Sequence, residues 1–103
     1  MTRAFDVTPL ARLDALSAVE WYEEKRVGLG DEFTEEVDRV FAAIRSREEF
    51  IVAPYARLPT FVVRRLFVSR FPFRVFITET DTRRDVFAIL RDGQQELHWQ
   101  SRI

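Results

Sequence analysis

Two short stretches restrict the possible folds of this chain more than any other feature of its sequence. Residues 21–33 (WYEEKRVGLGDEF) join two helical patterns through a turn in which Gly28 or Gly30 can adopt the left-handed conformation. Residues 63–76 (VRRLFVSRFPFRVF) alternate in polarity on both sides of a turn at residues 70–72, which predicts an arginine-bearing β-hairpin. Because a helical hairpin must cover something apolar, the two stretches together predict an α+β fold with the helices packed on the sheet.

Each predicted helix has its own start signal and its own apolar pattern. The first begins at Thr8 and Pro9, a capping residue followed by a proline that the first turn tolerates, and it runs to about Arg26. The second begins with Asp31 as its N-cap. The apolar residues of the first helix are Leu13, Leu16, Val19 and Tyr22 at three-residue steps, and those of the second form one stripe of Phe33, Val37, Val40, Phe41 and Ile44.

The remaining segments predict a twisted antiparallel sheet. Residues 4–8 form a first short strand, and residues 61–69, 73–78 and 85–91 form a meander that follows a loop over residues 46–60. One face of this sheet is buried on the helices, and the second face is partly apolar as well, so that Phe67 or Phe76 is expected to point outward. Residues 96–102 are expected to form a helical turn or an extended arm. We expect all of residues 1–103 to form one domain.

The composition is compatible with a reducing compartment. The chain has no cysteine, so it has neither a disulfide framework nor a thiolate metal site. Its N-terminus lacks the apolar stretch of a signal peptide, and no apolar run approaches the length of a membrane span. We therefore expect a cytoplasmic protein without membrane contacts.

The net charge of −1 conceals a strong division along the chain. Residues 11–50 carry eleven acidic side chains against six basic ones, whereas residues 57–91 carry eight arginines against three acids. Such asymmetry can guide a partner to one side of a protein, although scattered solvated charges can also produce it. Lysine is almost absent, and arginine favours planar, bidentate contacts over those of a point charge.

The arginines of the hairpin are the best candidates for a binding site. Arg64 and Arg65 are neighbours in a strand and must point to opposite faces of the sheet, so one of them is expected to pair with an acid of the second helix, Asp38 or Glu35. The other is expected to face outward together with Arg74. Guanidinium groups among Phe67, Phe73 and Phe76 suit a nucleic acid or an acidic protein, and they could also simply solubilise the sheet.

Motifs for catalysis are absent from the sequence. There is no glycine-rich phosphate loop, nucleophile elbow or metal-ligand cluster, and the single histidine is His98. The carboxylates of Glu20, Glu23 and Glu24 share one side of a helix and most simply form a solvated surface. We expect no catalytic residue, no metal and no cofactor, which favours a binding protein over an enzyme.

Five short motifs, taken in order, resemble those of the ParE branch of the ParE/RelE-like toxins of type II toxin–antitoxin systems, a group that includes plasmid stabilisation proteins. These motifs are the WYEE run before the glycine turn, the helix that follows, the paired arginines, the FPFRVF hairpin and the VFAIL strand, and they span about residues 5–99. The resemblance implies a bacterial toxin with a helical hairpin on a twisted antiparallel sheet and with a cognate antitoxin as its partner. Antitoxins of such pairs usually wrap the toxin with a helix and an extended segment.

Within this group, ParE-like members bind and poison DNA gyrase, whereas RelE-like members cleave mRNA on the ribosome. The net charge of −1 favours the ParE-like activity, because a ribosome-bound nuclease needs a strongly cationic surface. The RelE-like endonuclease is the alternative.

Both a homodimer and a toxin–antitoxin hetero-oligomer agree with the resemblance. The resemblance offers Arg64, Arg65, Arg70, Arg74, Arg91 and Trp99 as candidates for target binding, and Trp21, Phe67, Phe73 and Phe76 as candidates for antitoxin binding.

The segment after the last strand departs from the pattern of the group. Members commonly have a His, one or two arginines and a Pro before a terminal Trp, whereas this chain has Arg91 in place of the His, glutamines in place of the arginines, and no proline before Trp99. This departure supports a third alternative, a non-toxic member that retains only the binding of its antitoxin.

Overall fold

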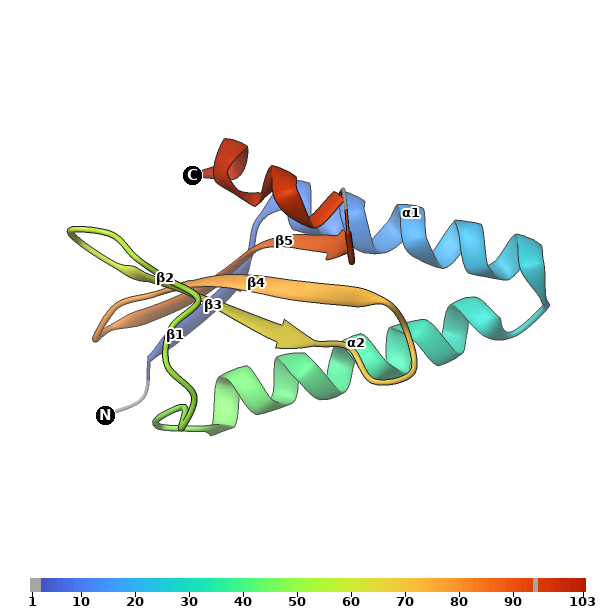
Figure 1. Ribbon diagram of the computed structural model, residues 1–103. Coiled ribbons are helices and arrows are strands. Elements are labelled where there is room, and N and C mark those ends of the chain that lie inside the picture. Colours follow the sequence, from blue (N-terminus) through green and yellow to red (C-terminus); the bar gives the residue numbers. More distant parts are fainter. Residues whose placement is uncertain (1–2, 94) are drawn as a thin grey trace.

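The protein has an α+β fold, as the sequence predicts. The computed structural model describes residues 3–93 and 95–103. Along the chain the elements are β1 (Ala4–Val7), α1 (Pro9–Lys25), α2 (Leu29–Ser46), β2 (Ala56–Arg57), β3 (Val62–Phe67), β4 (Phe73–Glu79), β5 (Arg83–Arg91) and the 3-10 helix η1 (Gln95–Arg102). The two helices lie antiparallel on one side of the sheet (Figure 1).

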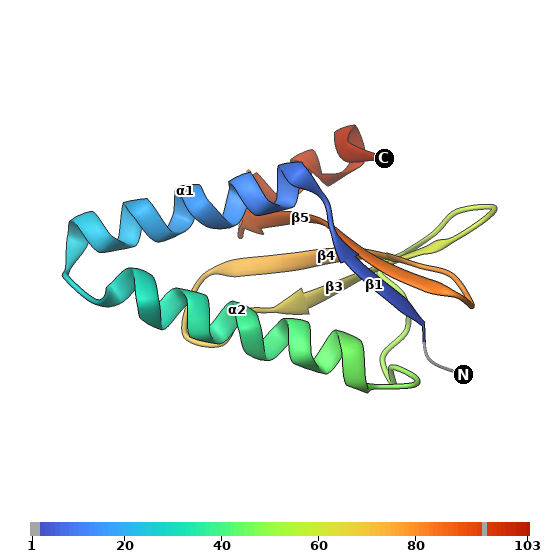
Figure 2. The same cartoon turned by 180° about the vertical axis from the view of Figure 1, so that it is seen from behind.

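The sheet is antiparallel along the meander and gains one parallel strand at its edge. Its strand order is β1-β5-β4-β3-β2, and the predicted meander of β3, β4 and β5 is antiparallel. The segment predicted as a loop contributes one short strand, β2, which pairs antiparallel with β3. The first strand, β1, joins the sheet parallel to β5, with Ala4 opposite Arg83 and Val7 opposite Val86. Parallel pairing requires a long crossover, which the helices and the meander together provide. In Figure 2, the view from behind, β1 lies in front of the other strands.

The turn between the helices has a cap that the sequence pattern did not reveal. Gly28 adopts φ of +90°, as expected for one of the two glycines, and it is the N-cap of α2. The predicted N-cap Asp31 is wrong, because α2 already begins at Leu29. The carboxylate of Glu23 on α1 accepts hydrogen bonds from the backbone N–H groups of Gly28 (2.9 Å) and Gly30 (3.0 Å). The preceding helix thus supplies the acceptor that the first turn of α2 needs.

Gly30 has a second role, in the packing of the two helices. A Cβ atom at this position would lie 2.9 Å from the carbonyl oxygen of Val19. The missing side chain therefore lets α2 approach the backbone of α1 closely.

The main core lies between the helices and the sheet. The stripe of α2 is confirmed, with Phe33, Val37, Val40 and Ile44 buried and Phe41 packed at the margin. On α1 the buried residues are Ala11, Ala18 and Tyr22.

The predicted stripe of α1 is only partly right. Leu13 and Leu16 are 58% and 53% exposed. Each three-residue step falls about 60° short of a full turn in a helix of 3.6 residues per turn, so the three steps from Leu13 to Tyr22 cannot remain on one face. The small residues Ala11 and Ala18 face the sheet instead.

A second apolar cluster covers the opposite face of the sheet. It contains Val63, Phe76, Phe87, Ala88, Leu90 and Trp99. The ring of Trp99 on η1 stacks on Phe76 at 6.3 Å between centroids, and Phe76 is fully buried. Of the two phenylalanines expected to point outward, only Phe67 does so, with 62% of its surface exposed.

The C-terminal segment forms a helical turn, one of the two predicted alternatives, and is fixed to α1. Both terminal nitrogens of Arg102 donate to the carboxylate of Asp14, each at 2.9 Å. Asp14 also accepts a hydrogen bond from the backbone N–H of Ile89 on β5. In the described ranges, no helix combines the length and apolar character needed to cross a membrane.

Candidate protein-interaction groove

A groove lies between α2 and β3. It encloses about 680 Å³. Its apolar lining includes Val40 and Ala43 of α2, Phe50 and Val52 of the connecting segment, and Leu66 and Phe67 of β3, and its charged lining consists of Glu36, Arg39, Arg47, Arg64 and Arg65. An apolar floor with four guanidinium groups and one carboxylate around it suits an amphipathic segment that carries negative charge.

The groove follows an edge of the sheet. Strand β2 pairs only with Val62 and Val63. From Arg64 to Phe67, β3 is therefore the outermost strand in the described part of the chain. Outer strands that are left uncovered are common docking sites for extended segments.

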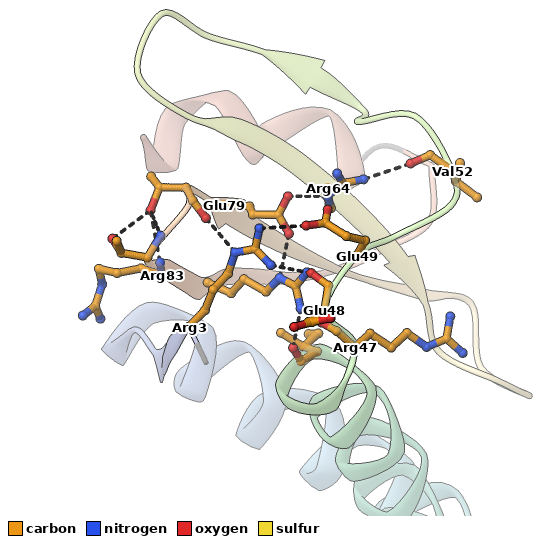
Figure 3. Close-up of polar contacts among 12 residues, drawn as sticks. Arg3, Arg47, Glu48, Glu49, Val52, Arg64, Glu79 and Arg83 are labelled. Carbon is orange, nitrogen blue, oxygen red and sulfur yellow. Dashed lines mark hydrogen bonds and ion pairs between the residues drawn. The ribbon is translucent and has the colours of Figure 1, made fainter. Parts of the chain in front are cut away.

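One wall of the groove is held in place by a buried carboxylate between two arginines. Glu79 of β4 accepts hydrogen bonds from Arg84 Nε at 2.6 Å and from Arg64 Nε at 2.8 Å. Arg64 continues to the carbonyl oxygen of Val52 at 2.9 Å, as Figure 3 shows. Burial by itself would raise the pKa of Glu79, but the hydrogen bonds from Arg64 and Arg84 outweigh it and hold the pKa below its usual value. Glu79 is thus an anion that binds the connecting segment to the sheet.

Arg84 also fixes the end of α2. Its guanidinium, 2% exposed as a residue, donates to the carbonyl oxygens of Ile44 (2.8 Å), Arg47 and Glu48 (3.0 Å). A cation is favourable at a helix C-terminus, where the last carbonyls lack intrahelical donors. The ring of Phe50 lies between this guanidinium, at 4.5 Å, and that of Arg64, at 5.1 Å.

On the opposite face of the sheet, two arginines alternate with two aromatic rings. The guanidinium carbon of Arg65 lies 4.3 Å from the ring centroid of Tyr55 and 5.6 Å from that of Phe67. Arg74, directly across from Phe67 in the β3–β4 register, lies 4.0 Å from the same Phe67 ring. We call Tyr55, Arg65, Phe67 and Arg74 the arginine–aromatic stack. Because Tyr55, Arg65 and Phe67 also line the groove, the stack and the groove form one continuous surface.

The two neighbouring arginines point to opposite faces, as predicted, but the partner of the inward one is different. Arg64 pairs with Glu79 of the adjacent strand, and neither Asp38 nor Glu35 on α2 takes that place. Both of these acids are exposed. An acid two strand positions away along the same face lies nearer to Arg64 than the outer side of α2 does.

Arg70 belongs to the turn and not to the stack. It has φ of +71° and donates to Glu32 of α2 at 2.6 Å, with Glu36 at 3.6 Å. The hydrogen bonds from Arg70 and Arg26 lower the pKa of the Glu32 carboxyl. The ion pair between Arg70 and Glu32 connects the β3–β4 turn to α2.

Arg91 and Trp21 lie together at a different site. With Leu13, Asp14 and Phe73 they line a cleft of about 340 Å³ between α1 and β5. The exposed ring of Trp21 has Arg91 at 4.8 Å and Lys25 at 4.6 Å from its centroid. The remaining candidates, Phe73, Phe76 and Trp99, are buried and support the surface from beneath.

Sequence reasoning missed several residues of the groove. Tyr55, Phe50 and Val52 lie in the segment predicted as an aperiodic loop, and only their apolar character between charged and proline residues hinted at a packing role. Arg39 and Ala43 of α2 and its C-cap Arg47 recur at four-residue steps beside the apolar stripe, a pattern typical of the rim of a helix. Among residues 3–93 and 95–103, no group of three or more His, Cys, Asp or Glu side chains is arranged to hold a metal ion.

Comparison with known proteins identifies the fold. No protein-family model and no curated protein matches the chain. A chain of the solved structure described as "Chromosomal ParDE TA system from P. aeruginosa" superposes with a TM-score of 0.74 at 14% sequence identity, and the match covers 89% of this chain and 98% of that chain. The ParE/RelE-like fold expected from the sequence is therefore confirmed, and this chain is a structural neighbour of a component of the P. aeruginosa ParDE system.

Proposed function

We propose that this protein is the toxin of a type II toxin–antitoxin pair, that it inhibits DNA gyrase by binding, and that a cognate antitoxin neutralises it in the cytoplasm. Three findings support this proposal: the fold shared with the ParDE component, the groove along the sheet edge, and the arginine–aromatic stack that continues it. The toxin and its antitoxin form a hetero-oligomer in this proposal.

The antitoxin occupies the groove between α2 and β3. An amphipathic segment would bury apolar side chains against Val40, Phe50 and Leu66 and direct acidic ones to the surrounding arginines. The observation that carries the proposal is that Arg65 and Phe67 belong to both the groove and the stack. An occupant of the groove therefore covers Arg65, one of the arginines offered for contact with a target, so that neutralisation follows from occlusion.

Binding without cleavage agrees with the chemistry of the stack. Its charged groups are guanidinium groups, which stay protonated at all physiological pH values and cannot exchange protons as a general acid or base. They can still donate bidentate hydrogen bonds to carboxylate or phosphate groups of a target. The stack is thus suited to recognition.

Two assays on the purified protein test the target. We expect inhibition of DNA supercoiling by gyrase and no cleavage of ribosome-bound message in an in vitro translation reaction. Message cleavage with supercoiling unaffected would overturn the proposal in favour of the RelE-like alternative. Inducible expression should arrest growth, and growth without arrest despite tight antitoxin binding would point to the non-toxic alternative.

A pair of neighbouring alanines on α2 tests the antitoxin site. Ala43 lines the groove, whereas Ala42 is exposed outside it. We expect Ala43→Trp to fill the groove and to weaken binding of the co-expressed antitoxin by about a hundredfold, equivalent to about 2.7 kcal/mol. Ala42→Trp is the matched control and should bind like the wild type. Equal binding by both variants would place the antitoxin elsewhere.

A further inference from the structure

The apolar residues of α1 are divided between its two sides in the reverse of the usual order. The side that faces the sheet buries Ala11, Ala18 and Tyr22, of which two are small. The outer side exposes larger residues, since Leu10 and Leu13 are 52% and 58% exposed. A surface helix normally buries its large apolar side chains and turns polar ones to the solvent. The outer side of α1 therefore has the character of a surface that a partner covers.

The exposed residues of α1 form one continuous stripe. Leu10, Leu13, Ser17 and Trp21 follow one another at steps of three, four and four residues, so their side chains share one face of the helix. We call these four residues the α1 stripe. The ring of Trp21 is 44% exposed at one end of the stripe. Figure 1 and Figure 2 show α1 and α2 as an outer layer of the molecule, so that a partner can approach from the solvent.

The cleft between α1 and β5 adjoins the stripe and can receive a side chain of a partner. It encloses about 340 Å³, and its lining includes Leu13, Ser17 and Trp21. The two charged residues of its lining already have contacts within the chain, Asp14 with the Arg102 guanidinium and Arg91 with the Trp21 ring. A tryptophan beside a pocket is typical of the anchor points of protein interfaces. Stripe and cleft together thus offer the apolar surface that an amphipathic helix requires.

The charges beside the stripe favour a basic partner. Glu20 and Glu24 lie one helical turn apart next to the stripe, and both are exposed. The two cations of α1 are engaged, because Arg12 is in an ion pair and Lys25 lies over the Trp21 ring. Two carboxylates with this spacing suit lysine or arginine side chains of a helix that packs alongside α1.

The same carboxylates argue against other occupants. In a symmetric dimer the stripes of two copies would meet, which would bring Glu20 and Glu24 of one copy close to those of the other. A nucleic acid or an anionic membrane would be repelled as well. The surroundings reinforce this selection, since residues 11–50 carry eleven acidic side chains against six basic ones.

We propose that the α1 stripe is a docking surface for a basic amphipathic helix of a partner protein. The partner helix lies along α1, packs its apolar side chains on Leu10 and Leu13, and inserts one of them into the cleft beside Trp21. Its lysine or arginine side chains reach Glu20 and Glu24. The lining of the groove between α2 and β3 includes no residue of α1, so this inference goes beyond the proposed function and does not depend on it.

Fluorescence anisotropy with labelled helical peptides tests this surface. The probe is an amphipathic helix of leucine and lysine, and the matched control has glutamate in place of every lysine. A second control has the composition of the probe in an order that forms no apolar stripe. We expect only the probe to bind the wild-type protein. Its affinity should fall as salt is added, because ion pairs at the surface are screened.

Single variants locate the peptide on the protein. Leu13→Arg places a cation in the middle of the stripe, and we expect it to weaken binding of the probe about tenfold. The matched control is Ile51→Arg, because Ile51 is a fully exposed apolar residue in the segment after α2 and the change in charge is the same. It should bind like the wild type. Thermal unfolding of both variants verifies that the fold is retained.

A double variant tests the charges beside the stripe. We expect Glu20→Gln combined with Glu24→Gln to weaken binding about fivefold at low salt, and the loss should disappear at high salt. The control is Glu35→Gln combined with Asp38→Asn, which makes the same change in net charge at exposed positions of α2. The affinity of this control should stay within about twofold of that of the wild type.

Several results would overturn the inference. They are failure of the probe to bind, equal binding of the glutamate peptide, equal affinities of Leu13→Arg and Ile51→Arg, and equal losses in the two double variants. A wild-type dimer in sedimentation equilibrium that Leu13→Arg dissociates would mean that a second copy covers the stripe. Binding to phosphatidylglycerol vesicles but not to the probe would identify a membrane surface instead.

The outcome can be separated from that of the proposed function. Ala43→Trp fills the groove and should leave binding of the probe unchanged, and a loss in this variant would contradict a separate surface on α1. Growth arrest on expression, or its absence, bears only on the toxin assignment.

Discussion

Arginines on the two faces of one sheet have opposite roles in this protein. On the helix face, Arg64 and Arg84 surround the carboxylate of Glu79 and bind the carbonyl oxygens of the segment after α2. On the other face, the guanidinium carbons of Arg65 and Arg74 lie 5.6 Å and 4.0 Å from the ring centroid of Phe67, which is mostly exposed. Residues 64 and 65 are adjacent in the chain and both partly buried, yet they point to opposite faces of the sheet.

The difference shows what decides the role of an arginine. A guanidinium surrounded by carboxylate and carbonyl oxygens has its donors committed to the fold, and its removal leaves buried acceptors without partners. A guanidinium held by ring faces keeps its orientation through contacts that do not require its donors. Variants at the two sites should therefore separate stability from recognition.

The largest effect is expected at Arg84. The variant Arg84→Met keeps much of the side-chain volume but leaves the buried carboxylate of Glu79 and the carbonyls at the end of α2 without their donor. We expect the free energy of unfolding to fall by about 3–5 kcal/mol, measured by chemical denaturation. The neighbouring Arg83→Met is the control, because Arg83 pairs with Asp85 on the surface, and it should unfold like the wild type. Similar stability of the two variants would refute the structural role assigned to Arg84.

The variant Glu79→Gln tests the same cluster through its charge. An amide retains a hydrogen-bond acceptor but not the anion between two guanidinium groups, so we expect a loss of about 2–3 kcal/mol at neutral pH. Because the pKa of Glu79 is lowered in the folded protein, its stabilisation is complete above the pKa of the unfolded chain and is lost as the pH falls below about 4.5 through the folded value.

Denaturation measured from pH 7 to pH 3 follows this dependence. We expect the difference in stability between the wild type and Glu79→Gln to be constant near neutral pH and to shrink in acid. A difference that stays constant down to pH 3, or that grows, would show that Glu79 is not held as an anion by Arg64 and Arg84.

The adjacent pair Arg64 and Arg65 gives the most direct comparison. For Arg64→Met we expect a loss of about 2 kcal/mol, because hydrogen bonds to Glu79 and to the Val52 carbonyl disappear while Arg84 still pairs with Glu79. For Arg65→Met the loss should stay below about 1 kcal/mol, since its side chain packs on the rings of Tyr55 and Phe67 at the partly exposed outer face of the sheet. The reverse order of stabilities, from denaturation of the two variants under one condition, would break the division between the faces.

The sequence predicted this division in part. Strand alternation correctly placed Arg64 and Arg65 on opposite faces, because that property depends only on local geometry. The partners of the inward arginines depend on contacts far along the chain: Arg84 binds the carbonyl of Ile44 forty positions away. Propensity and periodicity carry no information about such pairs, which is why α2 was expected to supply the acid.

Contacts between residues far apart in the chain also explain why Phe67 and Phe76, on the outer face of the sheet, differ in exposure. Alternation places Phe67 and Phe76 on one face of the sheet, and by itself it predicts the same exposure for both. The tail of the chain covers Phe76 with Trp99 and leaves Phe67 uncovered. Which ring remains available for a partner is therefore decided by the docking of η1, through Arg102 and Asp14, and not by the strands themselves.

The smallest expected effect concerns Asp92, the carboxylate that the stack already holds. Asp92 is half exposed and pairs with Arg74 at 3.2 Å, so Asp92→Asn should leave the free energy of unfolding nearly unchanged. It removes a negative charge next to the stack, and we expect the labelled antitoxin to bind about twofold more tightly. The gain should disappear at high salt, because the repulsion that it relieves is screened there. Anisotropy titrations at low and high salt measure both parts, and weaker binding by Asp92→Asn at low salt would mean that Asp92 serves to position Arg74 for the partner instead of competing with it.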